Sequence, residues 1–268
     1  MNSERLTREL AGWTVRYHES VDSTNAAART WLKSADPPPR SGIVVADEQT
    51  AGRGRFGRRW ETPPGTSVAM SLVFESPSPA GLPQAAGVAT ALAIQPLVTG
   101  QVGLKWPNDV EIDGRKVAGI LIEHQPVAGA AWYVVGIGIN VDLDFTSLAG
   151  VPDDLARRAT SIARHTADAG GVDREKLVGD VAREFNRWRP NVGLQQRWTA
   201  LLTTLGRRIS VRSRDAVITG RAVDVDEYGA LLIEDDRGRT VKVGAGDVTV
   251  VDGGGDGGIV DGGFSNGD

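Results

Sequence analysis

The sequence contains no cysteine, which excludes disulfide bonds, thiol nucleophiles and cysteine-ligated zinc. Histidine is scarce, and His18, His124 and His165 are too scattered to show metal-ligand spacing. No apolar run approaches the roughly 18 residues of a membrane span. The polar N-terminus, MNSERLTREL, does not have the pattern of a signal peptide. These absences favour a cytoplasmic protein without a membrane anchor.

The rest of the composition is that of an ordinary globular protein. The 268 residues are 40% hydrophobic and 24% charged, which is enough for one large domain or a medium domain with a small one. The formal net charge is -4, so the chain as a whole does not attract nucleic acid or anionic membranes. Any anion site must therefore come from a local patch.

Hydrophobic patterning predicts alternating strands and helices over the first 205 residues. Ser23 or Thr24 is the expected N-cap of the first helix. The stretch 102–125 is expected to form strand, turn, strand, turn, strand, and the next strand to end at a glycine-spaced corner. The remaining predicted elements are strands at 13–20, 42–49 and 67–75, and helices at 22–33, 82–98, 173–189 and 194–205.

The pattern changes after Gly206. Short β-segments with turns at 227–229 and 235–238 predict a small barrel. The end of the chain is glycine-rich and acidic, and it cannot bury enough apolar surface to become ordered. The sequence therefore predicts a main domain at 1–205, a small β-domain at 206–252 and a disordered tail at 253–268.

A glycine and arginine loop, TAGRGRFGRRW, occupies residues 50–60 and contains the G-x-G-x-x-G spacing of dinucleotide-binding units. Such a unit needs a helix directly after its glycines, and Pro63 and Pro64 leave no room for one. Glycines allow close backbone approach, and arginines suit phosphate or carboxylate. The loop therefore favours a flexible basic cover for a polyphosphate, with a solvated basic turn as the alternative.

Three further motifs carry candidate chemistry. In KWPNDV a lysine and an aspartate flank a turn, which suits phosphate and either Mg²⁺ or a ribose hydroxyl, although a surface ion pair is also possible. In GRKVAGILIE, Lys116 enters an otherwise apolar strand, where it could also be an edge lysine reaching water. GIGIN, residues 136–140, indicates a bulge or tight bend.

In this order, six segments together closely resemble biotin–protein ligases. They are DSTN, EQTAGRGRFGRRW, KWPNDV, GRKVAGILIE, GIGIN and ATSI, and they cover most of residues 22–162. The resemblance implies an α/β (α+β) fold: a mixed-sheet catalytic domain similar to class II aminoacyl-tRNA synthetases, followed by a small SH3-like barrel. The β-rich C-terminal part of the chain fits that barrel.

The resemblance also implies the reaction and its participants. Biotin would be activated by ATP, with Mg²⁺, to biotinyl-5′-AMP with release of pyrophosphate. The biotinyl group would then pass to a lysine of a biotin carboxyl carrier protein or domain of a biotin-dependent carboxylase. Adenylation provides the leaving group that makes an inert carboxylate reactive toward an amine.

The family match assigns roles to individual residues. Lys116, Arg53 and Arg55 would be catalytic, with Lys116 between the biotin carboxylate and the α-phosphate, and Asp109 is the candidate metal ligand. Trp60 would stack on adenine. The biotin-binding set would be Ser23, Thr24, Asn25, Gln49, Gly52, Arg53, Gly54, Arg55, Lys116, Gly119 and Gly138. The ATP-binding set would be Arg55, Arg58, Trp60, Lys105, Asn108, Asp109, Lys116 and Asn140.

Two alternative functions remain, and the sequence differs from some family members at its N-terminus. A lipoate–protein ligase is disfavoured by the fully formed GRGRFGR and KWPND segments. A non-catalytic RNA- or peptide-binding protein is disfavoured by the net negative charge and by the few aromatic residues around the arginine loop. Some family members carry an N-terminal winged helix, and only 21 residues precede DSTN. We therefore expect no sequence-specific DNA binding.

Overall fold

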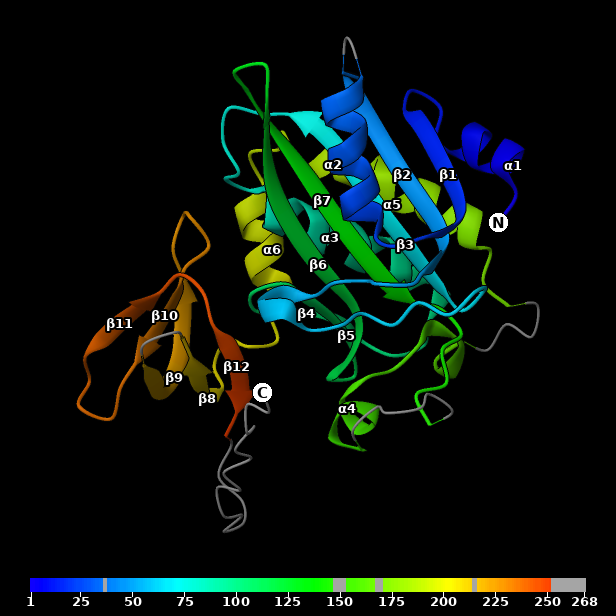
Figure 1. Cartoon of the computed structure of the whole chain (residues 1–268). Coiled ribbons are helices and arrows are strands. Elements are labelled where there is room, and N and C mark those ends of the chain that lie inside the picture. Colours follow the sequence, from blue (N-terminus) through cyan, green and yellow to red (C-terminus); the bar gives the residue numbers. More distant parts are fainter. Residues whose placement is uncertain (36–37, 147–152, 167–170, 214–215, 252–268) are drawn as a thin grey trace, which may run out of the picture.

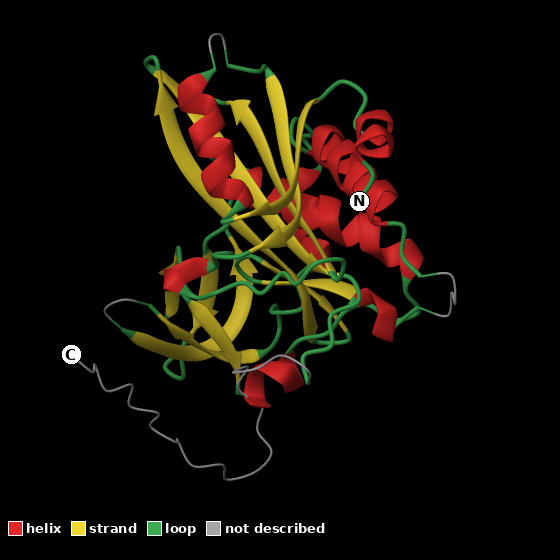
Figure 2. Cartoon of the chain, turned by 45° about the vertical axis from the view of Figure 1, so that its right-hand side comes forward, coloured by secondary structure: helices red, strands yellow, loops and turns green. Residues whose placement is uncertain are grey.

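The computed structural model describes residues 1–35, 38–146, 153–166, 171–213 and 216–251, and the tail prediction for 253–268 lies outside these residues. Within the described residues the chain forms a seven-stranded mixed sheet and a five-stranded antiparallel sheet (Figure 1). Helices cover both faces of the larger sheet (Figure 2). This mixed α/β arrangement agrees with the predicted fold class.

The larger sheet has the strand order β1-β2-β3-β7-β6-β5-β4. β1 and β2 are parallel, and the other neighbours are antiparallel, which makes the sheet mixed. The predicted strand, turn, strand, turn, strand over 102–125 is confirmed as β4, β5 and β6. The bounds are β1 Thr14–Val21, β2 Ser41–Gln49, β3 Ser67–Glu75, β4 Val102–Lys105, β5 Asp109–Ile112, β6 Arg115–Val127 and β7 Ala130–Asn140.

Six α-helices and three short 3₁₀ segments are seen in the described part of the chain. The α-helices are α1 Ser3–Glu9, α2 Thr24–Ser34, α3 Leu82–Ile94, α4 Asp153–Arg158, α5 Arg174–Trp188 and α6 Leu194–Leu201. The 3₁₀ segments are η1 Arg55–Gly57, η2 Gln95–Leu97 and η3 Ile162–Arg164. α2 lies on one face of the larger sheet, and α3 and α5 pack together on the other (Figure 1).

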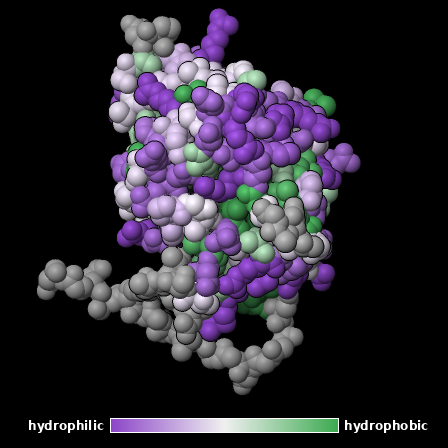
Figure 3. All heavy atoms as spheres, turned by 90° about the vertical axis from the view of Figure 1, so that its right-hand side faces the viewer, coloured by the Kyte–Doolittle hydropathy of each residue, from purple (hydrophilic) through white to green (hydrophobic). Residues whose placement is uncertain are grey.

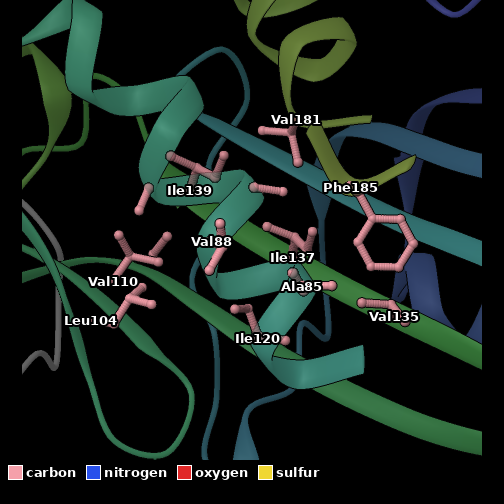
Figure 4. Packing of buried hydrophobic residues seen from close by; sticks show 14 of the residues in the cluster. Ala85, Val88, Leu104, Val110, Ile120, Val135, Ile137, Ile139, Val181 and Phe185 are labelled. Atoms are coloured by element: carbon pink, nitrogen blue, oxygen red, sulfur yellow. The ribbon is translucent and has the colours of Figure 1, made fainter. Parts of the chain in front are cut away.

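Successive side chains of a strand point to opposite faces of the sheet, so each strand contributes to the hydrophobic cores on both faces. Ile43 and Val45 of β2 belong to the large core under α3 and α5, whereas Val44 packs with Trp31 of α2. Figure 4 shows the large core, where Phe185 of α5 faces residues of α3 and β7. Each fully buried aliphatic side chain of this kind stabilises the fold by about 1.5–3 kcal/mol.

Two helical features differ from the sequence prediction. α1 was not expected, because its stretch is mostly polar; it is held by the Asn2 side chain, which accepts from the Arg5 backbone at 3.0 Å, and by buried Leu6. α3 ends at Ile94 rather than at 98, and a 3₁₀ segment containing Pro96 follows. Proline lacks the amide hydrogen that a continuing helix needs.

The expected bend at GIGIN is wrong. Gly136–Asn140 are a regular part of β7 and pair continuously with β3 and β6. These glycines do not mark a turn. They mark positions where the Asn25 and Trp60 side chains lie directly on the sheet.

The smaller sheet has the order β11-β10-β9-β8-β12. Its strands are β8 Arg208–Arg212, β9 Val217–Val225, β10 Leu231–Glu234, β11 Thr240–Val243 and β12 Asp247–Val250. It is joined to the β4–β5 turn by the Trp106 indole, which donates to the Gly229 carbonyl at 2.9 Å. The predicted domain boundaries at 205 and 252 stay predictions.

The outer surface is mainly polar on the side shown in Figure 3, where hydrophilic residues cover most of the described surface. In the described part of the chain, no helix combines the length and the apolar character needed to cross a membrane.

Candidate active site

A floor of small residues lies in the middle of the larger sheet, on the face that carries α2. Gly119 of β6 is opposite Gly138 of β7, and Ser71 of β3 is opposite Gly136. We call Gly119, Gly136 and Gly138 the glycine floor. A Cβ on Gly136 would lie 2.3 Å from Asn25 Oδ1, and one on Gly138 would lie 2.5 Å from Trp60 Nε1. Glycine is therefore required by close side-chain approach, not by an unusual backbone conformation.

A chain of neutral polar side chains borders one end of the glycine floor. Gln49 Oε1 accepts from the Thr24 backbone at 2.9 Å and lies 3.1 Å from the Thr24 hydroxyl. Ser71 Oγ lies 2.8 Å from Thr24 Oγ1 and 2.7 Å from Asn25 Oδ1. We call Thr24, Asn25, Gln49 and Ser71 the polar chain. Thr24, Asn25 and Ser71 are buried, so their donors and acceptors are held in one arrangement.

The start of α2 brings these groups together. Ser23 is the N-cap residue and is buried, but within the described residues its side chain makes no capping hydrogen bond. The predicted N-cap position is thus confirmed, without the usual side-chain bond. Gln49 is the last residue of β2, the strand parallel to β1, so the chain enters the glycine and arginine loop beside the helix.

The glycine and arginine loop folds as a tight hairpin. The Trp60 amide donates to the Gly52 carbonyl at 2.9 Å, and the Gly54 amide donates to the Arg58 carbonyl at 2.7 Å. A Cβ on Gly52 would lie 2.3 Å from the Trp60 carbonyl oxygen, which explains the glycine there. Phe56 at the tip has φ +55° and is 57% exposed.

The hairpin places Trp60 on the glycine floor. A Cβ on Gly119 would lie 3.1 Å from the Trp60 ring, and Lys116 Nζ lies 5.3 Å from that ring's centroid. Among the residues that the structure describes, the buried Nε1 of Trp60 has no hydrogen-bond partner. Stacking of Trp60 on adenine stays a prediction.

Charged side chains border the other end of the glycine floor. Lys116 Nζ lies 2.7 Å from Asp109 Oδ1, and Lys105 Nζ lies 4.0 Å from Glu111 Oε1. Lys105 and Asp109 face each other across β4 and β5. Burial raises the pKa of Glu111, and the nearby Lys105 opposes that effect. We call Lys105, Asp109, Glu111 and Lys116 the charged row.

Two loop arginines connect the site to the smaller sheet. Arg55 Nη1 donates to Asn108 Oδ1 at 2.8 Å and to the Gly246 carbonyl at 3.4 Å. Burial lowers the pKa of Arg55. Arg58 is an exposed side chain that forms an ion pair with Asp247 at the start of β12. Asn108 also donates to the Ile120 carbonyl at 3.0 Å, which fixes the KWPND turn on β6.

The end of β7 is tied to the segment that follows α4. Asn140 is buried and its amide donates to the Thr160 carbonyl at 3.1 Å. The Thr160 amide in turn donates to the Lys116 carbonyl at 2.8 Å. His165 lies 2.9 Å from the Thr160 hydroxyl, and burial, with Arg115 nearby, lowers its pKa. The backbone of Lys116 is therefore anchored by the segment that follows α4, and the end of β7 holds that segment in turn.

The protein side chains of this site could bind Mg²⁺ only together with oxygen atoms of a substrate. Within the described residues, no group of three or more histidine, cysteine, aspartate or glutamate side chains could hold a metal. Asp109 and Glu111 are already next to lysines. Mg²⁺ commonly binds one or two carboxylates together with substrate phosphates. The residues fit that mode, with Asp109 as a protein ligand, but they do not form a complete metal site.

Most of the predicted residues lie in one region of the structure, and their individual roles stay predictions. Gly119 and Gly138 lie under the Trp60 ring, and Gly52 and Gly54 lie within the hairpin that carries Trp60. The polar chain and the charged row lie at opposite ends. Arg58 is the outlier, because it is turned to Asp247 and to solvent.

Sequence reasoning missed Ser71, Glu111 and Glu123. Ser71 is a fully buried polar residue within an apolar strand, and that pattern could have marked it. Glu123 ends the GRKVAGILIE motif and contacts Asn25, a residue 98 positions earlier. A contact over that sequence separation leaves no local signal.

Comparison with known proteins decides the family. Residues 17–140 match the Biotin/lipoate A/B protein ligase family, and residues 204–251 match the Biotin protein ligase C terminal domain. The biotin–[acetyl-CoA-carboxylase] ligase of Paracoccus denitrificans is 34% identical over 82% of this chain and 94% of its own length. The chain belongs to the biotin protein ligase family. It is a ligase enzyme, as the motifs predicted.

Other members of the biotin protein ligase family agree with this assignment. The biotin–[acetyl-CoA-carboxylase] ligase of Mycobacterium tuberculosis is 35% identical over 77% of each chain. The solved biotin protein ligase of Aquifex aeolicus in complex with biotin and ATP superimposes with a TM-score of 0.73 at 25% identity, over 89% of this chain and 99% of that one.

Proposed function

We propose that this biotin protein ligase activates biotin with ATP and transfers it to a lysine of a biotin carboxyl carrier protein or domain. The observation that carries the proposal is the Lys116–Asp109 pair, 2.7 Å apart, at one end of a glycine floor that the glycine and arginine loop covers. Relatives named biotin–[acetyl-CoA-carboxylase] ligase and a neighbour solved with biotin and ATP support it.

In the first step a carboxylate oxygen of biotin attacks the α-phosphorus of ATP. The new oxygen–phosphorus bond forms as the bond to the β-phosphate oxygen breaks, and pyrophosphate leaves with the electron pair. Two anions approach each other, so the step needs positive charge that is already in place. Lys116, oriented by Asp109, supplies that charge, Arg55 supplies more from the loop, and Arg53 would do so on leaving Glu123.

In the second step the neutral amine of the acceptor lysine attacks the acyl carbon. The carbon–nitrogen bond forms, the carbon–oxygen bond to AMP breaks, and a proton leaves the nitrogen to solvent. The polar chain holds the ureido ring of biotin during both steps. Its hydroxyl and amide groups match the carbonyl and two N–H groups of that ring.

Mg²⁺ would neutralise phosphate charge when bound, with Asp109 as its protein ligand. Lys105, Asn108 and Asn140 line the nucleotide side in this proposal, together with Trp60. Location in the cytoplasm and absence of sequence-specific DNA binding remain predictions.

The test is biotin-dependent exchange of labelled pyrophosphate into ATP, with lipoate as the parallel acid and RNA binding measured on the same preparation. Exchange with biotin alone, followed by labelling of a purified carrier domain, supports the proposal. Exchange with lipoate alone would make the chain a lipoate ligase. Salt-sensitive RNA binding without any exchange would favour a binding protein.

A further inference from the structure

Glu123, near the middle of β6, connects α2 to the glycine and arginine loop through one carboxylate. Asn25 Nδ2 donates to Glu123 Oε2 at 2.8 Å, and Arg29 forms an ion pair with the other oxygen. Arg53 Nη2 lies 3.8 Å from that second oxygen. Asn25 and Arg29 are four residues apart on α2 and so share one face of the helix.

This carboxylate determines how the Asn25 amide is oriented. An ionised carboxylate only accepts hydrogen bonds, so the nitrogen of the amide must face Glu123. The Leu121 carbonyl, 3.3 Å from Asn25 Nδ2, requires the same orientation. The amide oxygen then faces Ser71 Oγ at 2.7 Å.

The orientation passes along the polar chain. The Ser71 hydroxyl has one hydrogen, and Asn25 Oδ1 can only accept, so Ser71 gives its hydrogen to Asn25. The same Ser71 hydroxyl could also donate to Thr24 Oγ1, 2.8 Å away, so its single hydrogen goes to Asn25 because the amide oxygen faces it. Thr24 donates its own hydrogen to Gln49 Oε1 at 3.1 Å. Reversing the amide would place a donor opposite Ser71 and turn the Ser71 hydrogen toward Thr24.

We propose that Glu123 is a positioning residue for the cyclic urea of biotin. It orients the Asn25 amide and, through it, the hydrogen of the Ser71 hydroxyl. The inference rests on the proposed function. A urea presents one acceptor and two donors in fixed geometry, so a pocket with the Asn25 amide and the Ser71 hydroxyl turned round would meet it with mismatched partners.

Glu123→Gln tests this proposal, because glutamine keeps the size of the side chain but adds a donor that lets the Asn25 amide turn round. We expect biotin to bind about tenfold more weakly by calorimetry, which corresponds to about 1.4 kcal/mol. kcat of pyrophosphate exchange and KM for ATP should stay close to the wild-type values. Glu184→Gln is the matched control, since Glu184 is a half-buried glutamate that pairs with Arg187 on α5, outside the site.

A second variant, Ser71→Ala, tests the same proposal if Glu123→Gln folds poorly. Ser71→Ala removes the group through which the orientation passes, so it should also weaken biotin binding. Adding Glu123→Gln to Ser71→Ala should then have a clearly smaller effect than in the wild-type background.

Three results would overturn the proposal. The first is unchanged biotin affinity in Glu123→Gln. The second is a fall in melting temperature with parallel losses in kcat and in both KM values, as a merely structural ion pair would give. The third is full additivity with Ser71→Ala. Wild-type protein that binds no biotin would instead contradict the proposed function, and that measurement is made first.

Discussion

The two ends of the glycine floor hold their side chains in different ways. The polar chain is neutral and largely buried, and each of its groups satisfies another through a hydrogen bond. The charged row is more open, with side-chain exposures of 30% for Lys116 and 24% for Asp109. Buried hydrogen-bonded groups are costly to rearrange, whereas partly exposed ion pairs exchange partners at little cost.

This difference suggests a division of labour within one site. The polar chain gives a fixed pattern of donors and acceptors, which suits recognition of a neutral ring. The charged row gives cations that can leave a carboxylate for a phosphate, which suits the reaction. Mutations at the two ends should therefore affect different kinetic constants.

The largest effect is expected at the charged row. Lys116→Ala removes the cation nearest the glycine floor and should reduce kcat of pyrophosphate exchange by about 10²–10³-fold, as loss of a transition-state donor commonly does. Biotin affinity should change little, because the polar chain is intact. Lys176→Ala, which removes an exposed lysine of α5, is the control. Undiminished exchange in Lys116→Ala would refute the assigned role.

Gly136→Ala should disrupt the polar chain at the opposite end of the glycine floor. Its Cβ would lie 2.3 Å from Asn25 Oδ1, so the Asn25 side chain must move away from Ser71. We expect about a hundredfold loss of biotin affinity, or about 2.7 kcal/mol, measured by calorimetry. Gly244→Ala is the control, because a Cβ there meets nothing within 4 Å. Equal biotin binding by both variants would show that Asn25 is not needed for recognition.

A smaller effect is expected from Glu111→Gln, which tests how the Glu111 charge affects the stability of the charged row. The raised pKa of Glu111 means that folding works against its ionised form, so stability is lost as pH rises from the unfolded-state pKa through the folded-state value. The variant should melt about 2 °C higher than wild type at pH 7. The gain should disappear below about pH 4, where both states are protonated. A gain that persists in acid would point to packing instead.

The smallest effect is expected from Arg58→Ala. Arg58 is exposed and pairs with Asp247, and exposed ion pairs contribute about 0–1 kcal/mol. Melting temperature and biotin affinity should stay near wild type, while KM for ATP reports any phosphate contact. A large rise in that KM would mean that Arg58 leaves Asp247 for the nucleotide.

Local patterns were sufficient for much of the fold. The helix predicted at 173–189 is α5, which buries Leu177, Val181 and Phe185, and the turn at Asp113–Gly114 has the positive φ angles that its residues favour. The GIGIN prediction was wrong because glycines in a strand resemble a break when the side chains that cover them are unknown. Those side chains, Asn25 and Trp60, come from distant segments.

Short motifs and periodicity were enough to predict the family, the α/β class, most elements and the candidate loop, lysine and polar residues. Tertiary structure decided which groups meet: Glu123 with Asn25, Ser71 with Thr24, and Arg58 with Asp247. Strand order and the packing of α2 set the first two pairs, and the position of the smaller sheet beside the loop sets the third, across 47 to 189 residues of chain. Contacts over such separations depend on how the whole chain folds, and no local sequence pattern predicts them.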